Sequence, residues 1–219
     1  MKPVIIGVGA ELQRGNLAAA GRALHEQGWM PGAAGSLSAR SGDAVLITVD
    51  GPDRGALTRD DIVMVEPGEG LPLLGEVDWP PADTALHLAL YRLLPACGAV
   101  VQAPTPHATT LASTAGTTGT VDQVTVNGRE SAHGMGLTAP HPAALPLVTT
   151  WPDVPCTAEA VADQLAGCGE DAPPALLIAG LGVLAWGRDL ATARERLAYV
   201  EELSRLALSA EERAVGAAG

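Results

Sequence analysis

Short apolar runs, each ending at glycine or proline, constrain the fold of this chain more than any other feature. Runs such as 44–49, 61–65, 99–103 and 175–179 have the length of strands and are bounded by turn residues. Other stretches carry apolar residues three or four positions apart, as at Leu17, Ala20 and Leu24, which predicts amphipathic helices. Because the two kinds of segment alternate, we expect an α/β or α+β protein with a central sheet.

Turn and cap residues set the bounds of the expected elements. The expected strands are 36–40, 44–49, 61–65, 99–103, 121–126, 146–151, 175–179 and 183–186. The expected helices are 12–27, 82–94, 105–115, 157–166 and 189–209, with Thr157 and Asp189 as N-caps of the last two. Glycine, proline and acidic residues predict irregular structure over 67–81, and 127–145 is also expected to be irregular. We find no repeat and no linker, so the 219 residues predict one domain over 1–219.

The charge of the chain excludes several classes of partner. Thirteen Lys and Arg face 25 Asp and Glu, a net charge of −12, which argues against nucleic acid and anionic membranes as general partners. No apolar run reaches the roughly 18 residues of a membrane span. The three cysteines form no CxxC pair, and the N-terminus is too short and too polar for a secretory signal. We therefore expect a cytoplasmic protein.

Five segments in order along the chain carry a family resemblance. They read GWMPGAAGSLSAR at 28–40, IT at 47–48, GALT at 55–58, TALHLALY at 84–91 and AGLGVLAWG at 179–187. The chain resembles the class II aldolase/adducin family, and most closely its methylthioribulose-1-phosphate dehydratase branch. The resemblance implies a three-layer α/β/α fold with a mainly antiparallel sheet. It also implies a small-molecule ligand and a homo-oligomer, typically a tetramer with active sites between subunits.

The metal ligands that the resemblance implies are replaced in this sequence. The family binds a divalent metal, usually zinc, through a His-x-His pair after a strand and a later His in a Gly-His-Gly turn. The pair falls on Gln102 and Pro104, and the third position falls on Leu181. Proline and leucine side chains offer no donor atom, and glutamine is not among the usual zinc ligands. We therefore predict no metal and no other cofactor.

The resemblance implies a catalytic acid and a substrate pocket, both altered here. The family's catalytic Glu falls on Asp83, which keeps a carboxyl group for general acid–base chemistry. Phosphate-binding positions carry Ser36, Asp50 and Pro81 in place of Asn, Ser and Ser. A carboxylate there repels a phosphate dianion, which favours a non-phosphorylated substrate, although Arg54 keeps a positive charge nearby.

We take Asp83 as the candidate catalytic residue, and Ser36, Asp50, Gln102 and His107 as candidate substrate-binding residues. Gln102 can hydrogen-bond a substrate carbonyl, and His107 can bring an imidazole to the altered site. Structural interpretations stand beside these roles. Asp83 can complement a helix N-terminus, Gln102 can be a satisfied strand-end amide and His107 a helix-surface residue. His87, one turn after Asp83, is expected in the core with a backbone hydrogen bond, and close enough to interact with Asp83.

Three functions remain open from the sequence. The first is a metal-independent lyase, dehydratase, isomerase or cyclase acting on a small non-phosphorylated molecule. The second is a non-catalytic relative that binds a ligand or a partner. The third is a metal-dependent lyase with replaced ligands, for which the loop residues His133 and His141 would have to join His107 and Asp83.

Overall fold

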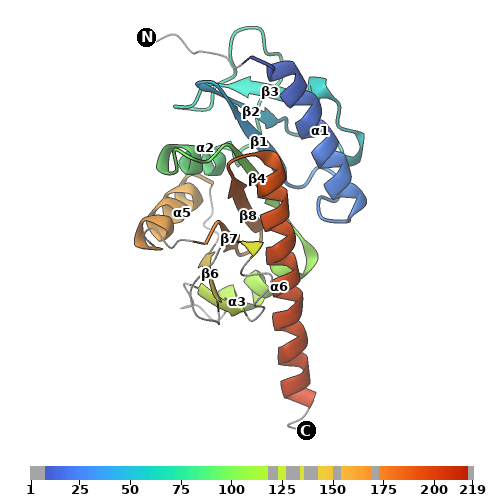
Figure 1. Cartoon of the computed structure of the whole chain (residues 1–219), viewed down its shortest axis with the longest axis vertical. Helices are drawn as coiled ribbons and strands as arrows, with labels where there is room; N and C mark the ends of the chain where they lie inside the picture. The colour runs from blue at the N-terminus through green and yellow to red at the C-terminus, as the bar shows by residue number, and fades with distance from the viewer. Residues whose placement is uncertain are drawn as a thin grey trace.

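An eight-stranded sheet forms the centre of the structure, a computed structural model that describes residues 8–117, 123–126, 134–135, 143–149, 154–168 and 173–216 (Figure 1). Its strand order is β3-β2-β1-β4-β8-β7-β6-β5. All neighbouring pairs are antiparallel except β6 and β7, which are parallel. The predicted mainly antiparallel sheet is therefore confirmed. The strands are β1 (Ser36–Ser41), β2 (Ala44–Thr48), β3 (Ile62–Val65), β4 (Ala99–Ala103), β5 (Gln123–Val126), β6 (Ala143–Val148), β7 (Ala175–Ile178) and β8 (Gly182–Gly187).

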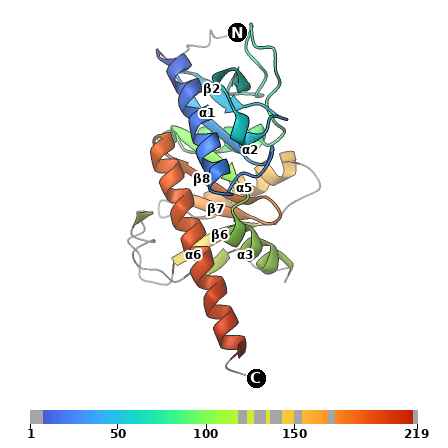
Figure 2. The same ribbon diagram turned by 90° about the vertical axis from the view of Figure 1, so that its right-hand side faces the viewer.

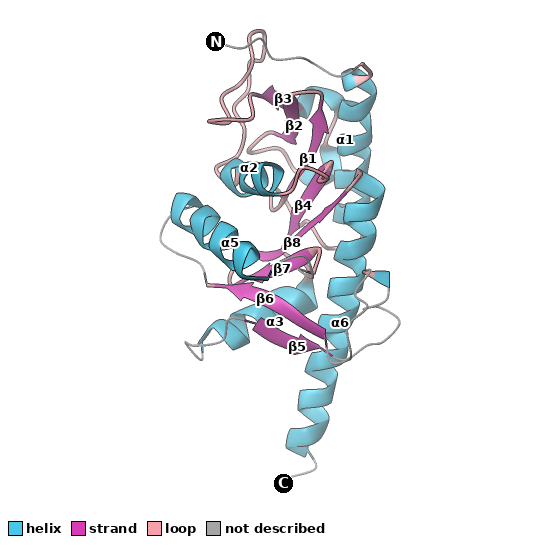
Figure 3. Ribbon diagram, turned by 60° about the vertical axis from the view of Figure 1, so that its left-hand side comes forward, coloured by secondary structure: helices cyan, strands magenta, loops and turns pink. Residues whose placement is uncertain are grey.

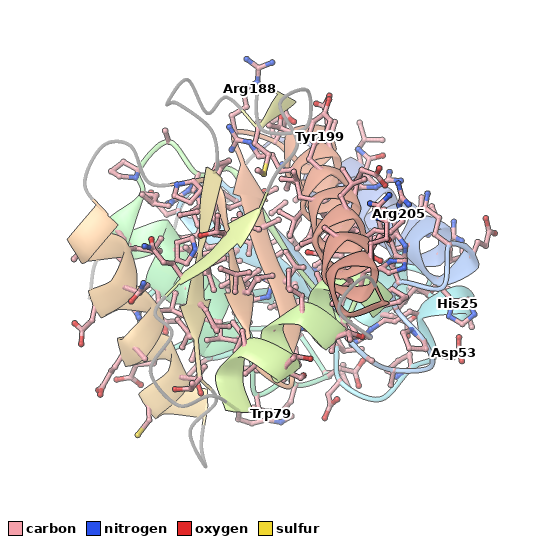
Figure 4. The ribbon with its side chains drawn as sticks, turned by 90° about the horizontal axis from the view of Figure 1, so that it is seen from below. His25, Asp53, Trp79, Arg188, Tyr199 and Arg205 are labelled. Atoms are coloured by element: carbon pink, nitrogen blue, oxygen red, sulfur yellow. The ribbon has the colours of Figure 1, made fainter. Side chains whose placement is uncertain are left out.

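Helices cover both faces of the sheet. On one face lie α1 (Ala10–Glu26), α3 (Pro106–Thr117) and α6 (Leu190–Gly216), and on the other lie α2 (Thr84–Leu93) and α5 (Val154–Cys168). Figure 2 shows α1 and α6 in front of the sheet, and Figure 3 shows α2 and α5 on its other side. Seen from below, the strands stand between α5 and α6 (Figure 4). The expected three layers are present.

Two separate apolar cores fill the spaces between the layers. Alternate residues of each strand point to opposite faces, so that Val101 packs toward α1 and α6, and Val100 packs toward α2 and α5. Two single-turn 3₁₀ helices (Arg54–Ala56 and Arg59–Asp61) follow β2 and lie against α1. Across the described ranges, we find no helix long and apolar enough to cross a bilayer.

Two sequence-based expectations about elements are wrong. Thr157 is buried inside α5 and does not cap it, because the helix begins at Val154, with Pro155 in the first turn where its missing N–H is tolerated. Strand β6 begins at Ala143, inside the expected irregular stretch, and ends at Val148. It includes Pro146, since a proline fits a strand where the ladder does not need its nitrogen. His133 and His141 lie outside the described residues.

Candidate active site

The start of β1, the end of β4 and the turn between β7 and β8 meet at one end of the sheet. Ser36 pairs with Gln102 across β1 and β4, and Gln102 pairs with Leu184 across β4 and β8. Directly opposed residues of an antiparallel pair point to the same face, so the side chains of Ser36 and Gln102 are neighbours on the face covered by α2.

The three positions that the resemblance aligns with metal-binding histidines converge at this end. The Gln102 amide nitrogen donates to the Leu181 carbonyl oxygen at 2.5 Å. A Cβ built on Gly182, next to Leu181, would lie 2.7 Å from the Cα of Pro104. The backbone therefore brings positions 102, 104 and 181 together.

The side chains at these positions do not fit a metal ion. Pro104 and Leu181 have no donor atoms, and the amide of Gln102 already bonds Leu181. Within the described ranges, no three His, Cys, Asp or Glu side chains gather closely enough to hold a metal. This donor set differs from the imidazole, thiolate and carboxylate ligands that zinc takes in proteins.

A chain of hydrogen-bonded polar side chains runs between β1 and α2. The Ser36 hydroxyl donates to Asp83 Oδ2 at 2.5 Å and lies 2.8 Å from His87 Nε2. The Ser38 hydroxyl lies 2.7 Å from His87 Nδ1 and 2.8 Å from the Tyr91 hydroxyl. Residues two apart on a strand share a face, as do residues four apart on a helix, so the two stripes meet along their length. We call these five residues the polar chain.

Burial sets the protonation of the polar chain. His87 is fully buried, and this burial lowers its pKa from 6.5 to about 4 against the opposing charge of Asp83. Burial also raises the pKa of the Tyr91 hydroxyl far above its ordinary value of 10. At neutral pH the chain therefore holds a neutral imidazole and a protonated phenol.

Asp83 stands at the solvent end of the polar chain. It occupies the N-cap position of α2, where its negative charge complements the helix N-terminus, although its side chain makes no capping hydrogen bond. Its Oδ1 is buried without a hydrogen-bond partner among the described residues, while Oδ2 accepts the Ser36 hydroxyl. The carboxylate thus has one oxygen held and one uncommitted.

Arg54 supports the backbone that leads into Ser36. Its guanidinium is 1% exposed and donates to the carbonyl oxygens of Gly35 at 2.9 Å and Val49 at 3.0 Å. Burial lowers its pKa, against the opposing negative charges of Asp83 and Asp50. Asp50 itself is exposed on the loop after β2.

His107 belongs to a helix on the other face of the sheet. It is the second residue of α3, which packs on the α6 face, opposite to α2. Its Nδ1 lies 2.7 Å from Glu201 Oε1 on α6, and its backbone N–H donates to the same oxygen. The structure therefore joins Ser36, Asp83 and Gln102 at one end of the sheet, and ties His107 to another element.

Sequence reasoning did not identify Ser38, Tyr91 or Glu201. It placed His87 in the core with a backbone bond, close enough to interact with Asp83. His87 is in the core, but its ring bonds the hydroxyls of Ser36 and Ser38. It reaches Asp83 through Ser36, not by direct contact. One sequence pattern could have indicated the polar chain. Polar residues stand two apart on an apolar strand, at positions 36 and 38, and four apart on an apolar helix, at positions 83, 87 and 91.

Known proteins give the context for this geometry. The family model described as "Class II Aldolase and Adducin N-terminal domain" matches residues 15–208. A methylthioribulose-1-phosphate dehydratase of Microcystis aeruginosa is 32% identical over 198 residues, covering 89% of this chain and 94% of that protein. A protein of Nocardia farcinica described as "Probable bifunctional methylthioribose-1-phosphate isomerase/methylthioribulose-1-phosphate dehydratase" is 38% identical over 205 residues.

The Nocardia match covers 94% of this chain and only 37% of that longer protein. Among solved structures, YgbL of Escherichia coli superposes with a TM-score of 0.75 at 26% identity, covering 91% of this chain and 89% of that one. The family match spans most of the chain, and the fold and the dehydratase relatives agree with it. The chain therefore belongs to the class II aldolase and adducin family.

Proposed function

We propose that this chain is a lyase-type enzyme in which Asp83 moves a proton on a small molecule without the histidine-bound metal of its family. The observation that carries the proposal is the state of the Asp83 carboxylate. One oxygen is fixed by Ser36 at 2.5 Å, and the other is buried without a partner among the residues described. A buried, unpaired carboxylate oxygen is poised to accept a proton from a bound substrate.

Dehydration of a hydroxycarbonyl compound is the reaction that suits this arrangement best. Asp83 would take the proton from the carbon next to the carbonyl, and those bonding electrons would form the new double bond as the neighbouring hydroxyl leaves. The protonated Asp83 would then return its proton to the departing hydroxide as water. The names of the Microcystis and Nocardia relatives, both dehydratases, support this reaction class.

Gln102 is our candidate for the residue that binds the substrate carbonyl. Its amide nitrogen has two hydrogens, and the bond to the Leu181 carbonyl uses one of them. The second hydrogen can donate to a carbonyl oxygen beside Ser36, where charge develops during proton removal.

Substitution of Asp83 tests the catalytic role. Asp83→Asn keeps the shape but removes the proton acceptor, so turnover should fall by about 100-fold or more. Asp60→Asn is the control, because the Asp60 side chain is 89% exposed on the surface. Activity of the Asp83 variant within about threefold of the parent would exclude Asp83 as the acid or base.

Metal analysis tests the proposed independence from metal. The chain purified by gel filtration should carry no stoichiometric zinc, manganese or iron. About one ion per chain would instead favour a metal-dependent lyase with replaced ligands, since a catalytic zinc site holds one such ion. The triple variant Gln102→His, Pro104→His and Leu181→His should gain zinc binding, because the backbone already brings these positions together.

We propose that the substrate lacks a phosphate group. Asp50 adds a negative charge close to Arg54, and the Arg54 guanidinium is engaged by backbone carbonyls. Methylthioribulose 1-phosphate and its dephosphorylated form, assayed side by side, provide the test. Faster turnover of the phosphorylated compound would contradict this part of the proposal. Saturable binding of either compound without turnover would favour a non-catalytic relative.

We also propose that the chain forms a homo-oligomer, with a tetramer as the expected size. Leu74, Val77 and Trp79 are exposed in the loop between β3 and α2, and Figure 4 shows Trp79 at the edge of the molecule. Large apolar side chains exposed on one loop are a candidate for a surface that is covered in an assembly. Light scattering at micromolar concentration should give a multiple of 22.2 kDa, and a monomer mass would contradict it.

A further inference from the structure

The number of hydrogens in the polar chain fixes the direction of its hydrogen bonds. The Ser36 hydroxyl donates to Asp83, so its only hydrogen is used there. The contact between Ser36 and His87 then needs a hydrogen on Nε2. A neutral imidazole carries one hydrogen, so Nδ1 must accept from Ser38. The hydrogen of Ser38 is thereby used, and Tyr91 must donate to Ser38.

We infer that His87 is a positioning residue: its bonds to Ser36 and Ser38 hold it as the Nε2–H tautomer, and the imidazole in turn orients the Ser36 hydroxyl toward Asp83. This inference rests on the proposed role of Asp83, because it describes what holds that carboxylate. By donating to Ser36, the imidazole occupies one lone pair of the hydroxyl oxygen and leaves its hydrogen directed at Asp83 Oδ2. The uncommitted Oδ1 is then the oxygen that can meet a substrate.

The opposite tautomer would disrupt the site. With the hydrogen on Nδ1, Nε2 would need the hydrogen of Ser36. The Ser36 oxygen would then face the Asp83 carboxylate at 2.5 Å with no hydrogen between them. Two oxygen atoms cannot remain that close without a hydrogen bond, so Asp83 would shift or take up a proton. The hydrogen bond between Ser38 and His87 therefore acts on the geometry of the Asp83 carboxylate through His87 and Ser36.

Burial and the surrounding groups keep this arrangement in one state. His87 and Ser38 are fully buried, and Tyr91 is 5% exposed, so water has little access to the middle of the chain. The groups that face His87 are Asp83 at one end and the protonated Tyr91 at the other, with the Arg40 guanidinium over the Tyr91 ring. An unpaired polar group here would carry the full penalty of desolvation.

Nitrogen NMR of the intact protein with ¹⁵N-labelled histidine tests the inference. His87→Gln identifies the His87 signals by their loss. In the parent protein, Nε2 of His87 should carry the hydrogen and Nδ1 should be bare. This state should persist to about pH 5.5, where a histidine of ordinary pKa is mostly charged.

Two further variants and one control locate the cause. Ser36→Ala and Ser38→Ala combined remove both partners of the ring, so the single-tautomer signal should be lost. Tyr91→Phe should keep the tautomer, since Ser38 retains its own hydrogen for Nδ1. Ser41→Ala is the matched control, because Ser41 is also buried in β1 and has no hydrogen-bond partner among the described residues.

A parent spectrum that shows the hydrogen on Nδ1, or a doubly protonated ring at neutral pH, overturns the inference even if a variant fails to fold. Retention of the single tautomer in the folded double variant Ser36→Ala/Ser38→Ala overturns it as well. The measurement needs no substrate. Failure of the Asp83 activity test therefore leaves the tautomer result standing, and failure of the tautomer test leaves the acid–base proposal standing.

Discussion

Replacing Glu201 with glutamine should destabilise the protein, because this carboxylate caps a helix that belongs to another part of the chain. Glu201 lies on α6, is 6% exposed, and accepts the backbone N–H groups of His107 and Ala108, each at 3.0 Å. These groups open α3, which has no intrahelical partner for its first N–H groups. The carboxylate thus does across the fold what an N-cap side chain does locally.

The magnitude follows from the bonds that glutamine cannot keep. Its amide oxygen can replace one carboxylate oxygen, but its nitrogen then faces the other backbone N–H. One charge-assisted hydrogen bond is lost, worth about 1.5–3 kcal/mol, and a buried N–H is left unpaired at about 1–3 kcal/mol. Because the two terms overlap, we expect the free energy of unfolding to fall by about 2–4 kcal/mol. For a chain of this size that is a Tm decrease of roughly 5–12 °C.

Urea unfolding of the parent and Glu201→Gln proteins gives the measurement, with Glu202→Gln as the control. Glu202 bonds Arg205 on the surface, where ion pairs contribute little, so the control should stay within about 0.5 kcal/mol of the parent. A decrease in the free energy of unfolding of less than about 0.5 kcal/mol in Glu201→Gln would refute the reasoning, because the bonds from His107 and Ala108 to Glu201 would then make no net contribution to stability.

The pH dependence supplies a second check on Glu201. Burial alone would raise the pKa of this carboxyl, but the bonds from the backbone and ring of His107 and from the backbone of Ala108 outweigh it and hold the pKa below 4.5. A carboxyl with a lowered pKa stabilises the folded state above its unfolded pKa, and this contribution is lost as the pH falls through the folded value. The difference between parent and variant should therefore shrink below about pH 4.5. A difference that grows on acidification would contradict this sign.

Two other substitutions test the backbone around the site. Arg54→Met leaves the carbonyls of Gly35 and Val49 unpaired and should lower the free energy of unfolding by about 2–4 kcal/mol. The control Arg59→Met changes an exposed side chain and should change this free energy by less than about 0.5 kcal/mol. Equal urea midpoints for the two variants would contradict the prediction. Gly35→Ala should lower the free energy of unfolding by more than about 2 kcal/mol, because the φ of Gly35 is +80° and a Cβ would lie 2.7 Å from the Gln102 carbonyl oxygen. The control Gly32→Ala, with φ +56° and open space around the Cβ, should lower it by only about 1–2 kcal/mol. Equal losses in the two variants would rule out the close contact as the cause.

Local patterns predicted the elements of this fold well where periodicity and turn residues agree. The strands around Ser41-Gly42-Asp43 and the helix before Gly28 are each found within two residues of their expected bounds. Prediction failed at β6, which begins three residues before Pro146, and at the start of α5, which begins at Val154, one residue before Pro155. A proline inside a strand or a first helical turn depends on which backbone groups its neighbours pair, and a local pattern does not contain that information.

The candidate site was predicted in part. The family resemblance led to Ser36, Asp83 and Gln102, which the structure brings to one end of the sheet. Ser38 and Tyr91 were missed because their contact depends on the register of α2 over β1, 53 positions apart in sequence. His107 was expected beside the substrate, but its bond to Glu201 arises from how α6 lies along α3.

The polar chain and the three replaced metal-ligand positions lie on different elements, and this has an evolutionary consequence. The polar chain belongs to β1 and α2, whereas positions 102, 104 and 181 belong to β4 and to the segments that follow β4 and β7. Gln102 bonds a backbone carbonyl, which every residue provides, so mutations at these three positions leave each buried hydroxyl and the imidazole with its partner. A gene lineage can therefore exchange these residues one at a time without removing a hydrogen-bond partner from the polar chain.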